Sequence, residues 1–171
     1  MQRTGESGLE LFISHRARPP LIVTSGVVLT TMPSATEIAE FLAREFPQNK
    51  CTVEAVGSRC ATVRHEIGVA ELRPGGTVSG PVLMAVADVA LYVAILGEIG
   101  IVPLTVTTNL NINFLRKPAT NAAIIGECRL LKLGKSLAVG EVSLFSEGSE
   151  EPVAHVVGTY SIPPSARESG K

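Results

Sequence analysis

The sequence predicts an α+β domain in which one antiparallel sheet wraps around a single long, buried helix. Residues 81–96 are apolar on almost every side, which is typical of a helix enclosed by other structure. Six strand-like segments flank this helix, two before it and four after it. Because the connections between these segments are short, we expect neighbouring strands to run antiparallel around the helix.

The composition fits one globular domain with an aliphatic core. The chain has 171 residues, of which 45% are hydrophobic and only 4% aromatic, and it contains no tryptophan. We expect the domain to span residues 33–163, followed by a tail over 164–171. The net charge of −1 creates no global field for nucleic acid or anionic lipid. We therefore expect no nucleic-acid partner and no membrane partner.

The first 32 residues are expected to form a poorly packed or strand-adding extension. Arg16 and Arg18 precede the apolar stretch 21–29, which faintly imitates a signal peptide. That stretch is too short to span a bilayer, and no disulfide pattern follows it. Met32 is an alternative functional start.

The cysteines and histidines favour a cytoplasmic protein without a metal or a separate cofactor. Cys51, Cys60 and Cys128 are odd in number and lack metal-ligand spacing, so we expect free thiols in a reducing compartment. The three histidines lie far apart and form no H-x-x-x-H or H-E-x-x-H pattern.

A helix is predicted to begin after Pro33. Ser34 can cap its free amides, and Glu37 can complete a capping box. Pro47 ends the run. Apolar residues recur at helical spacing between these points, at Ile38, Phe41, Leu42 and Phe46.

Two strands and a loop are expected between this helix and the long one. Residues 51–56 and 61–67 have strand composition, and the turn residues 57–59 join them. Residues 71–76, rich in glycine with one proline, predict a loop.

The long helix is expected to stop at Gly97 and Gly100. Residues 105–114 then alternate between apolar and polar, which predicts a strand with two distinct faces. One face would carry Val106, Leu110, Ile112 and Phe114, and the other Thr107, Asn109, Asn111 and Asn113.

Three further strands are expected at 122–133, 137–145 and 153–162, joined by turns at 134–135 and 147–149. A sheet half-wrapped around one helix leaves an edge strand to pair. We therefore expect a homodimer with a continuous sheet, or a tetramer built from two such dimers.

Asp88 is the candidate catalytic residue, because it is the only charged side chain between Ser79 and Gly97. A carboxylate in such apolar surroundings needs hydrogen bonds or a wet cavity, and it suits general-base or nucleophilic work. A structural aspartate hydrogen-bonded to backbone or to a partner chain is the alternative. Near Gly80, the free amides and dipole of the helix N-terminus could hold an oxyanion.

Three segments resemble motifs of one known family. Residues 76–81 together with Asp88 resemble the G-x-x-H-G-G-x-x-x-x-x-x-D signature of the PaaI-like (phenylacetic acid degradation-related) hotdog thioesterases. Residues 111–118 resemble that family's strand ending in F-L-R-P, and residues 134–142 resemble its G-K/R-x-L-A hairpin. Together the three segments fall within residues 37–163.

The resemblance implies a hotdog fold and hydrolysis of an acyl- or aryl-CoA thioester to free acid and CoA. It implies that Asp88 attacks the carbonyl or activates water, that the Gly80 amide binds the carbonyl oxygen, and that Thr107 orients the water. It places CoA phosphates near Arg116, Lys117 and the Gly134-Lys135 turn, contributed across a dimer. The other residues that it implies at the substrate are Arg73, Ser79 and Pro81.

Departures from the family pattern leave two alternatives open. Ser79 stands where the family has histidine, Arg73 where it has asparagine, and Pro81 where it has a second glycine. Ser79 is best interpreted as a helix cap, and Arg73 could supply the missing positive group. The losses motivate an alternative, a non-catalytic acyl-CoA-binding protein. A hotdog hydratase or dehydratase is less favoured, because no Asp-x-x-x-x-His arrangement follows Asp88.

Overall fold

The computed structural model describes residues 32–164. The predicted extension before residue 32 and most of the predicted tail lie outside the described residues. The elements, in order, are α1 (Ala35–Glu45), β1 (Cys51–Gly57), β2 (Cys60–His65), the 3-10 turn η1 (Val69–Glu71), β3 (Leu72–Arg73), β4 (Thr77–Val78), α2 (Gly80–Ile99), β5 (Val106–Phe114), β6 (Ile124–Leu133), β7 (Leu137–Ser146) and β8 (Pro152–Ser161).

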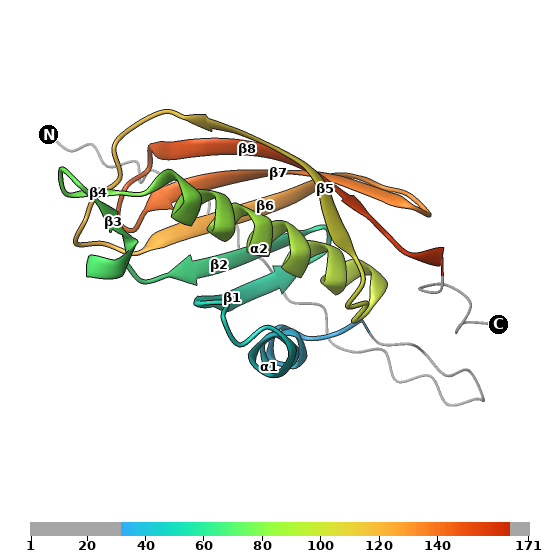
Figure 1. The fold of residues 1–171 in the computed structure, drawn as a ribbon. Coiled ribbons are helices and arrows are strands. Elements are labelled where there is room, and N and C mark those ends of the chain that lie inside the picture. The colour runs from blue at the N-terminus through green and yellow to red at the C-terminus, as the bar shows by residue number, and fades with distance from the viewer. Residues whose placement is uncertain (1–31, 165–171) are drawn as a thin grey trace, which may run out of the picture. The chain divides into compact units, whose positions relative to one another are not determined.

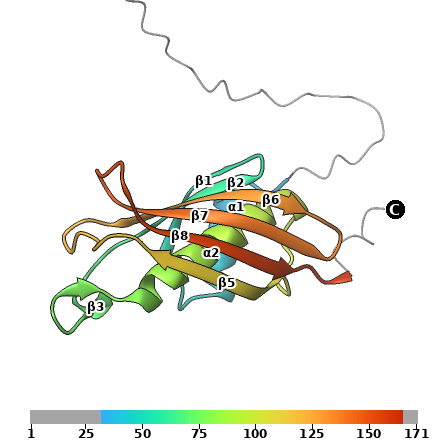
Figure 2. The ribbon, with the colours of Figure 1, turned by 90° about the horizontal axis from the view of Figure 1, so that it is seen from above.

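Six of the strands form one sheet in the order β1-β2-β6-β7-β8-β5, and every neighbouring pair is antiparallel. Figure 1 shows α2 crossing one face of this sheet, and Figure 2 shows the strand order from above. The predicted α+β architecture, with one sheet around one long helix, is confirmed. Among the described residues, β5, which follows α2 in the chain, pairs with β8 alone and lies at one edge of the sheet.

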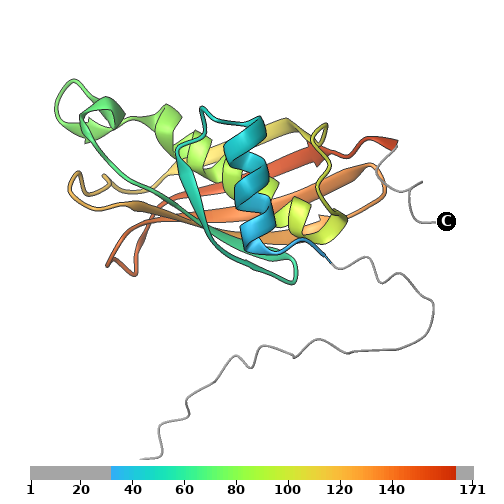
Figure 3. The ribbon, with the colours of Figure 1, turned by 90° about the horizontal axis from the view of Figure 1, so that it is seen from below.

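The first helix, α1, begins as the sequence predicts. The Ser34 hydroxyl accepts from the Glu37 amide at 3.2 Å, and the Glu37 carboxylate accepts from the Ser34 amide at 2.7 Å, so the capping box is complete. Phe41 on this helix meets Tyr92 of α2, with ring centroids 6.4 Å apart. Figure 3 shows α1 lying across α2.

The core forms around α2, whose buried residues point to nearly every side. By length and composition alone this helix could cross a membrane, but 61% of its most apolar window is buried inside the fold. Its inner neighbours on the sheet include Val63, Ile124, Val142 and Val156, all fully buried. Burial against the sheet accounts for an apolar helix of this length.

Strand ends differ from the prediction by one or two residues, and two further differences have a structural reason. The helix runs through Gly97 to Ile99, and Gly100, with φ 88°, ends it. Position 97 favours glycine because Val56 of β1 packs against it. A Cβ at this position would lie 2.5 Å from a Val56 methyl carbon. The predicted loop over 71–76 forms β3 and the turn of a small hairpin, and β4 follows as its second strand. The turn needs positive φ at Gly75 (91°) and Gly76 (64°).

Gly97→Ala should destabilise the fold by about 1–2 kcal/mol, because the new methyl group overpacks against Val56. Chemical unfolding of the purified protein measures this change. In a Val56→Ala background the same substitution should instead stabilise by about 0.5–1 kcal/mol, since alanine has the better helix propensity. Equal effects in both backgrounds would show that packing against Val56 does not select this glycine.

Candidate active site

Asp88 is held by two hydroxyl groups from strands that lie far from it in sequence. The Tyr160 hydroxyl of β8 donates to Oδ1 of Asp88 at 2.6 Å. The same hydroxyl lies 2.9 Å from the backbone carbonyl oxygen of Asp88. Thr107 of β5 donates to the same Oδ1 at 2.5 Å. Hydrogen bonds to a charged acceptor are the strong ones, so the half-buried carboxylate is fixed in place. No donor to Oδ2 occurs among the described residues, which leaves that oxygen available for a water or a substrate.

Tyr160 keeps its proton under ordinary conditions. Burial raises the pKa of its phenol, and the negative charge and hydrogen bond of Asp88 raise it further. Its ring is almost completely buried and stacks on Tyr92 with a centroid distance of 6.2 Å. The phenol is therefore a fixed hydrogen-bond donor to Asp88.

A β-bulge turns Thr107 toward Asp88. The alternating pattern of 105–114 predicts that Thr107 shares a face with Asn109, Asn111 and Asn113, and this prediction is wrong. In the pairing with β8, Thr107 faces Tyr160 and Asn109 faces Thr159, so Thr108 is an extra residue. The bulge shifts the alternation by one position, which puts Thr107 on the helix-facing side.

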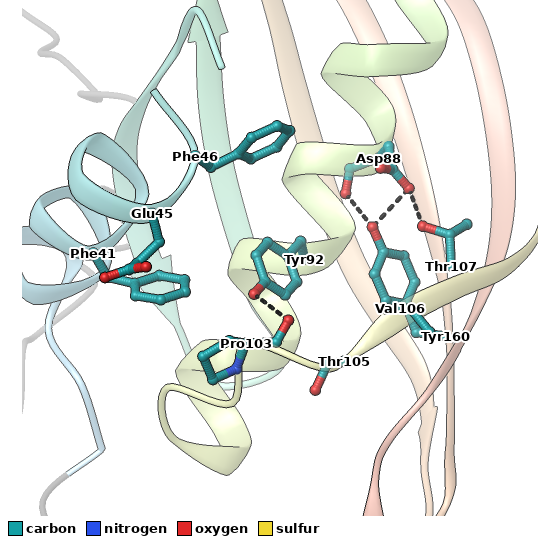
Figure 4. A pocket seen from close by; sticks show the side chains of 10 residues that line it. All are labelled: Phe41, Glu45, Phe46, Asp88, Tyr92, Pro103, Thr105, Val106, Thr107 and Tyr160. Carbon is teal, nitrogen blue, oxygen red and sulfur yellow. Dashed lines mark hydrogen bonds between the residues drawn. The ribbon is translucent and has the colours of Figure 1, made fainter. Parts of the chain in front are cut away.

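Asp88 lines a cavity of about 480 Å³ that is rich in aromatic rings. Figure 4 shows this aromatic cavity, with Asp88, Thr107 and Tyr160 at one side and α1 at the other. Four of the seven aromatic residues in the chain line it: Phe41, Phe46, Tyr92 and Tyr160. The Tyr92 hydroxyl donates to the Pro103 carbonyl at 3.2 Å. Apolar rings beside a polar cluster are typical of a ligand pocket.

Asp88 also lines a second cavity of about 340 Å³, which we call the His65 cavity. Its apolar wall comes from α2 and from Phe46, and its polar wall includes Lys50, His65 and Glu71. Phe46 and Asp88 are the two residues that both cavities share. The carboxylate therefore lies between two spaces that could each receive part of a ligand.

Gly80 and Asp88 cannot act together on one carbonyl within a single chain. Gly80 is the first residue of α2, and no hydrogen bond to its amide occurs among the described residues. Asp88 follows eight positions later, which separates the two along the helix by about 12 Å. Gly80 lies instead beside Phe114, at the far end of β5, where a Cβ would be 3.1 Å from the ring.

The other expected substrate residues on the helix side lie around the start of α2. Ser79 is the N-cap residue, and its carbonyl accepts from the Val82 amide at 3.2 Å. The prediction that its side chain caps the helix is wrong, because the hydroxyl makes no capping hydrogen bond. Arg73 is exposed on β3, and Pro81 is exposed in the first turn of α2.

The residues expected near CoA phosphates fall at opposite ends of the sheet. Arg116 and Lys117 follow the end of β5, whereas Gly134 and Lys135 lie in the β6–β7 turn, near the start of β5. The nine residues of β5 separate these two places by about 26 Å. One chain therefore does not bring them together.

Ion pairing distinguishes the three basic side chains. Arg116 binds Glu151 at 2.8 Å and the Pro152 carbonyl at 3.0 Å. Lys117 and Lys135 are exposed. The two lysines are therefore the more available groups for a phosphate.

Sequence reasoning missed Tyr160 and the polar wall of the His65 cavity. Tyr160 lies 72 positions after Asp88, so no local spacing connects them. The rarity of tyrosine was the available signal, since the chain has two tyrosines and both line the aromatic cavity.

Residues 32–164 contain no cluster of three or more histidine, cysteine or carboxylate side chains that could hold a metal ion. Cys51, Cys60 and Cys128 are free thiols.

Comparison with known proteins adds the family context. The family model described as the thioesterase superfamily matches residues 75–153, a span that includes α2 with Asp88 and β5 with Thr107. No curated protein matches the chain significantly.

Solved structures share the fold. A protein described as a candidate thioesterase from Silicibacter sp. is 43% identical, with a TM-score of 0.71; the match covers 79% of this chain and 97% of that one. The PaaI protein from the phenylacetic acid degradation operon of E. coli is 18% identical, with a TM-score of 0.62 and coverage of 75% and 92%. A Streptococcus mutans protein bound to acetyl-CoA is 16% identical, with a TM-score of 0.61 and coverage of 67% and 90%. The expected hotdog fold is confirmed.

The stability of the protein should fall as the pH is lowered below 6.5, the ordinary pKa of histidine. Burial lowers the pKa of folded His65, with Lys50 acting in the same direction and Glu71 and Glu66 opposing it. Between the two pKa values the unfolded chain binds a proton that the folded chain excludes. The contribution of neutral His65 to the free energy of unfolding is therefore complete above pH 6.5, and it is lost as the pH falls through the lower pKa of the folded state.

Urea unfolding on both sides of pH 6.5, in the parent and in His65→Gln, measures this contribution. The measurement should stay above pH 4.5, because Glu71, whose pKa is lowered by Lys50, starts to contribute below it. His65→Gln should flatten the slope of stability against pH. An unchanged slope would contradict a neutral, buried His65.

Proposed function

The chain belongs to the thioesterase superfamily, and on that basis we propose that it hydrolyses the thioester of an acyl- or aryl-CoA to a free acid and CoA. The observation that carries the proposal is the Asp88 carboxylate, fixed at Oδ1 by Tyr160 and Thr107 while two cavities meet at its side chain. A carboxylate positioned in this way can act as a general base.

The chemistry needs one water and no separate cofactor. Asp88 takes a proton from the water as the water oxygen attacks the thioester carbon. The bond from carbon to sulfur then breaks, and the leaving CoA thiolate takes that proton back from Asp88, which restores the carboxylate. Direct attack by Oδ2 is the nucleophilic variant, with an anhydride that water then opens. The Thr107 oxygen still has lone pairs to orient the water, since its proton goes to Asp88.

The developing oxyanion would bind the Gly80 amide of a second copy. Backbone amides at a helix N-terminus stabilise such charge, and the amide of Gly80 is free among the residues described. Because Gly80 and Asp88 of one chain are about 12 Å apart along α2, we propose that each site combines Asp88 from one protomer with Gly80 from its partner.

The free edge of the sheet offers the geometry for this dimer. In residues 32–164, β5 pairs only with β8. Asp88 contacts Thr107 near the start of β5, whereas Gly80 contacts Phe114 at its end. Antiparallel pairing of β5 with β5 of a second copy would place the end of one strand beside the start of the other. Each Gly80 would then approach the Asp88 of the other protomer.

The same pairing would gather the basic residues. Lys117, beyond the end of β5 in one protomer, would approach Lys135, near the start of β5 in the other. These lysines are the proposed contacts for CoA phosphates. The Gly134 amide donates to the Leu137 carbonyl at 2.8 Å, so we propose that Gly134 positions Lys135 in the turn. Arg116 would have to break its ion pair with Glu151 to join the lysines. Arg73 lies on the β3–β4 hairpin and could approach the phosphates only from there. A dimer of such dimers is compatible with this arrangement.

A non-catalytic acyl-CoA-binding protein is the second candidate function. Its support is the replacement of the family histidine by Ser79, whose hydroxyl makes no capping hydrogen bond, and of the family asparagine by the exposed Arg73. Free thiols at all three cysteines are compatible with the proposed cytoplasmic location under either function.

Asp88→Asn should lower kcat for thiol release from acyl-CoA by at least about 100-fold, because the general base is lost. A panel of short, medium, long and aromatic acyl-CoAs measures it. The asparagine oxygen can still accept from Tyr160 and Thr107, so the fold should be retained.

Glu40→Gln is the matched control, since it makes the same carboxylate-to-amide change at an exposed side chain of α1 that lines neither cavity. It should leave thiol release within about twofold of the parent, as surface substitutions usually have small effects. If the parent releases no CoA from any substrate yet binds CoA esters, the binding function replaces hydrolysis.

A further inference from the structure

Each of the two cavities that meet at Asp88 is lined by one residue that carries a buried polar atom without a partner. In the part of the chain that the structure describes, two buried side-chain polar atoms lack a hydrogen bond, Nε2 of His65 and Oγ1 of Thr105. His65 lines the His65 cavity, and Thr105 lines the aromatic cavity. An unpaired buried polar group is costly. Both atoms are therefore candidates for contact with a ligand.

Nε2 of His65 has no partner because its nearest candidate is already engaged. Oε1 of Glu71 lies 3.9 Å away, beyond hydrogen-bond distance. That oxygen accepts from Lys50 at 2.9 Å, and the other oxygen of Glu71 accepts from the Gly68 amide at 2.9 Å. The ring is more than nine-tenths buried. The carboxylate is thus held away from the imidazole.

The surroundings of the ring favour a neutral imidazole that donates from Nε2. Burial raises the pKa of the Cys51 thiol to about 12, so the thiol keeps its proton. Its sulfur lies 3.7 Å from Nδ1 of His65, and the S–H can donate there. In that tautomer Nε2 carries the proton. A neutral oxygen acceptor suits this N–H, because a carboxylate would also meet the negative charge of Glu71.

The wall of the His65 cavity that α2 supplies is largely apolar. One face of α2 lines the cavity, with Pro81, Val82, Ala85 and Val89 at helical spacing. From Pro81 to Val89 the helix rises about 12 Å. Asp88 lies on this wall, so a chain starting at Asp88 would pass apolar side chains as it extends toward His65.

The aromatic cavity suits the other half of the substrate. Val106 and Thr107 of the free edge strand β5 line it, so it adjoins the edge at which the second protomer would pair and from which the CoA arm would enter. The His65 cavity is lined by residues of the α1–β1 connection, β2, η1 and α2, and by none of β5. The His65 cavity is then the space that remains for the acyl group.

We propose that the far end of the acyl group occupies the His65 cavity and that Nε2 of His65 donates a hydrogen bond to an oxygen on it. The preferred substrates are then aliphatic acyl-CoAs of medium length that carry a hydroxyl or keto oxygen toward the end of the chain. This assignment of substrate class rests on the proposed thioester hydrolysis.

The direct test compares kcat/KM for octanoyl- and decanoyl-CoA with that for the same chains carrying a terminal hydroxyl group. The parent should prefer the hydroxylated substrates about tenfold, the effect of one buried hydrogen bond. His65→Leu should abolish the preference while hydrolysis of the plain chains continues. His65→Gln, which retains a donor, should restore part of it.

Thr105→Val is the matched control, because it removes the other unpaired polar atom with little change of shape. It should leave the preference as in the parent. Loss of the preference in Thr105→Val but not in His65→Leu would overturn the proposal and place the oxygen in the aromatic cavity. A parent that hydrolyses plain and hydroxylated chains equally would also overturn it. Absence of hydrolysis with every substrate would instead contradict the proposed function.

A measurement on the unmodified protein avoids any dependence on the folding of the variants. The ring nitrogen resonances of His65, followed by NMR, should shift at Nε2 when hydroxydecanoic acid binds and much less when decanoic acid binds. Equal shifts with the two acids would contradict a hydrogen bond from His65 to the distal oxygen, whether or not thioesters are hydrolysed.

Discussion

The site depends on the hydrogen bonds that hold the Asp88 carboxylate against the apolar helix α2. A carboxylate at such a position is costly unless its charge is compensated. Tyr160 and Thr107 compensate it at Oδ1, and they connect α2 to the last strand of the fold and to the free edge of the sheet. The sheet order and the bulge in β5 are what bring these two hydroxyls to one oxygen.

The same helix that positions Asp88 separates it from the Gly80 amide. The rise of an α-helix fixes that separation, so no change of side chain within one chain can bring the two groups to one carbonyl. The proposed dimer would remove the difficulty, because a two-fold pairing of edge strands would exchange the ends of β5 and with them the two ends of the site. The proposed chemistry therefore requires the proposed dimer.

The sequence predicted those features that follow from local patterns. The Ser34–Glu37 capping box, the all-round apolar helix and the isolated charge of Asp88 could each be read from a few neighbouring residues. The bulge that turns Thr107 toward the helix could not, because alternation shows a strand's faces only while its register is continuous. Tyr160 and the environment of His65 depend on contacts between distant segments, and no periodicity encodes them.

Subunit complementation tests directly whether the site is shared between two protomers. Asp88→Asn and Gly80→Pro, which lacks the amide proton, would be co-expressed with different tags and the mixed dimer isolated; Gly80→Ala controls for the contact with Phe114. With both single variants inactive, the mixed dimer contains one intact shared site and should show about half of the parental thiol release. An inactive mixed dimer, beside an active parent and an active Gly80→Ala, would contradict a shared site.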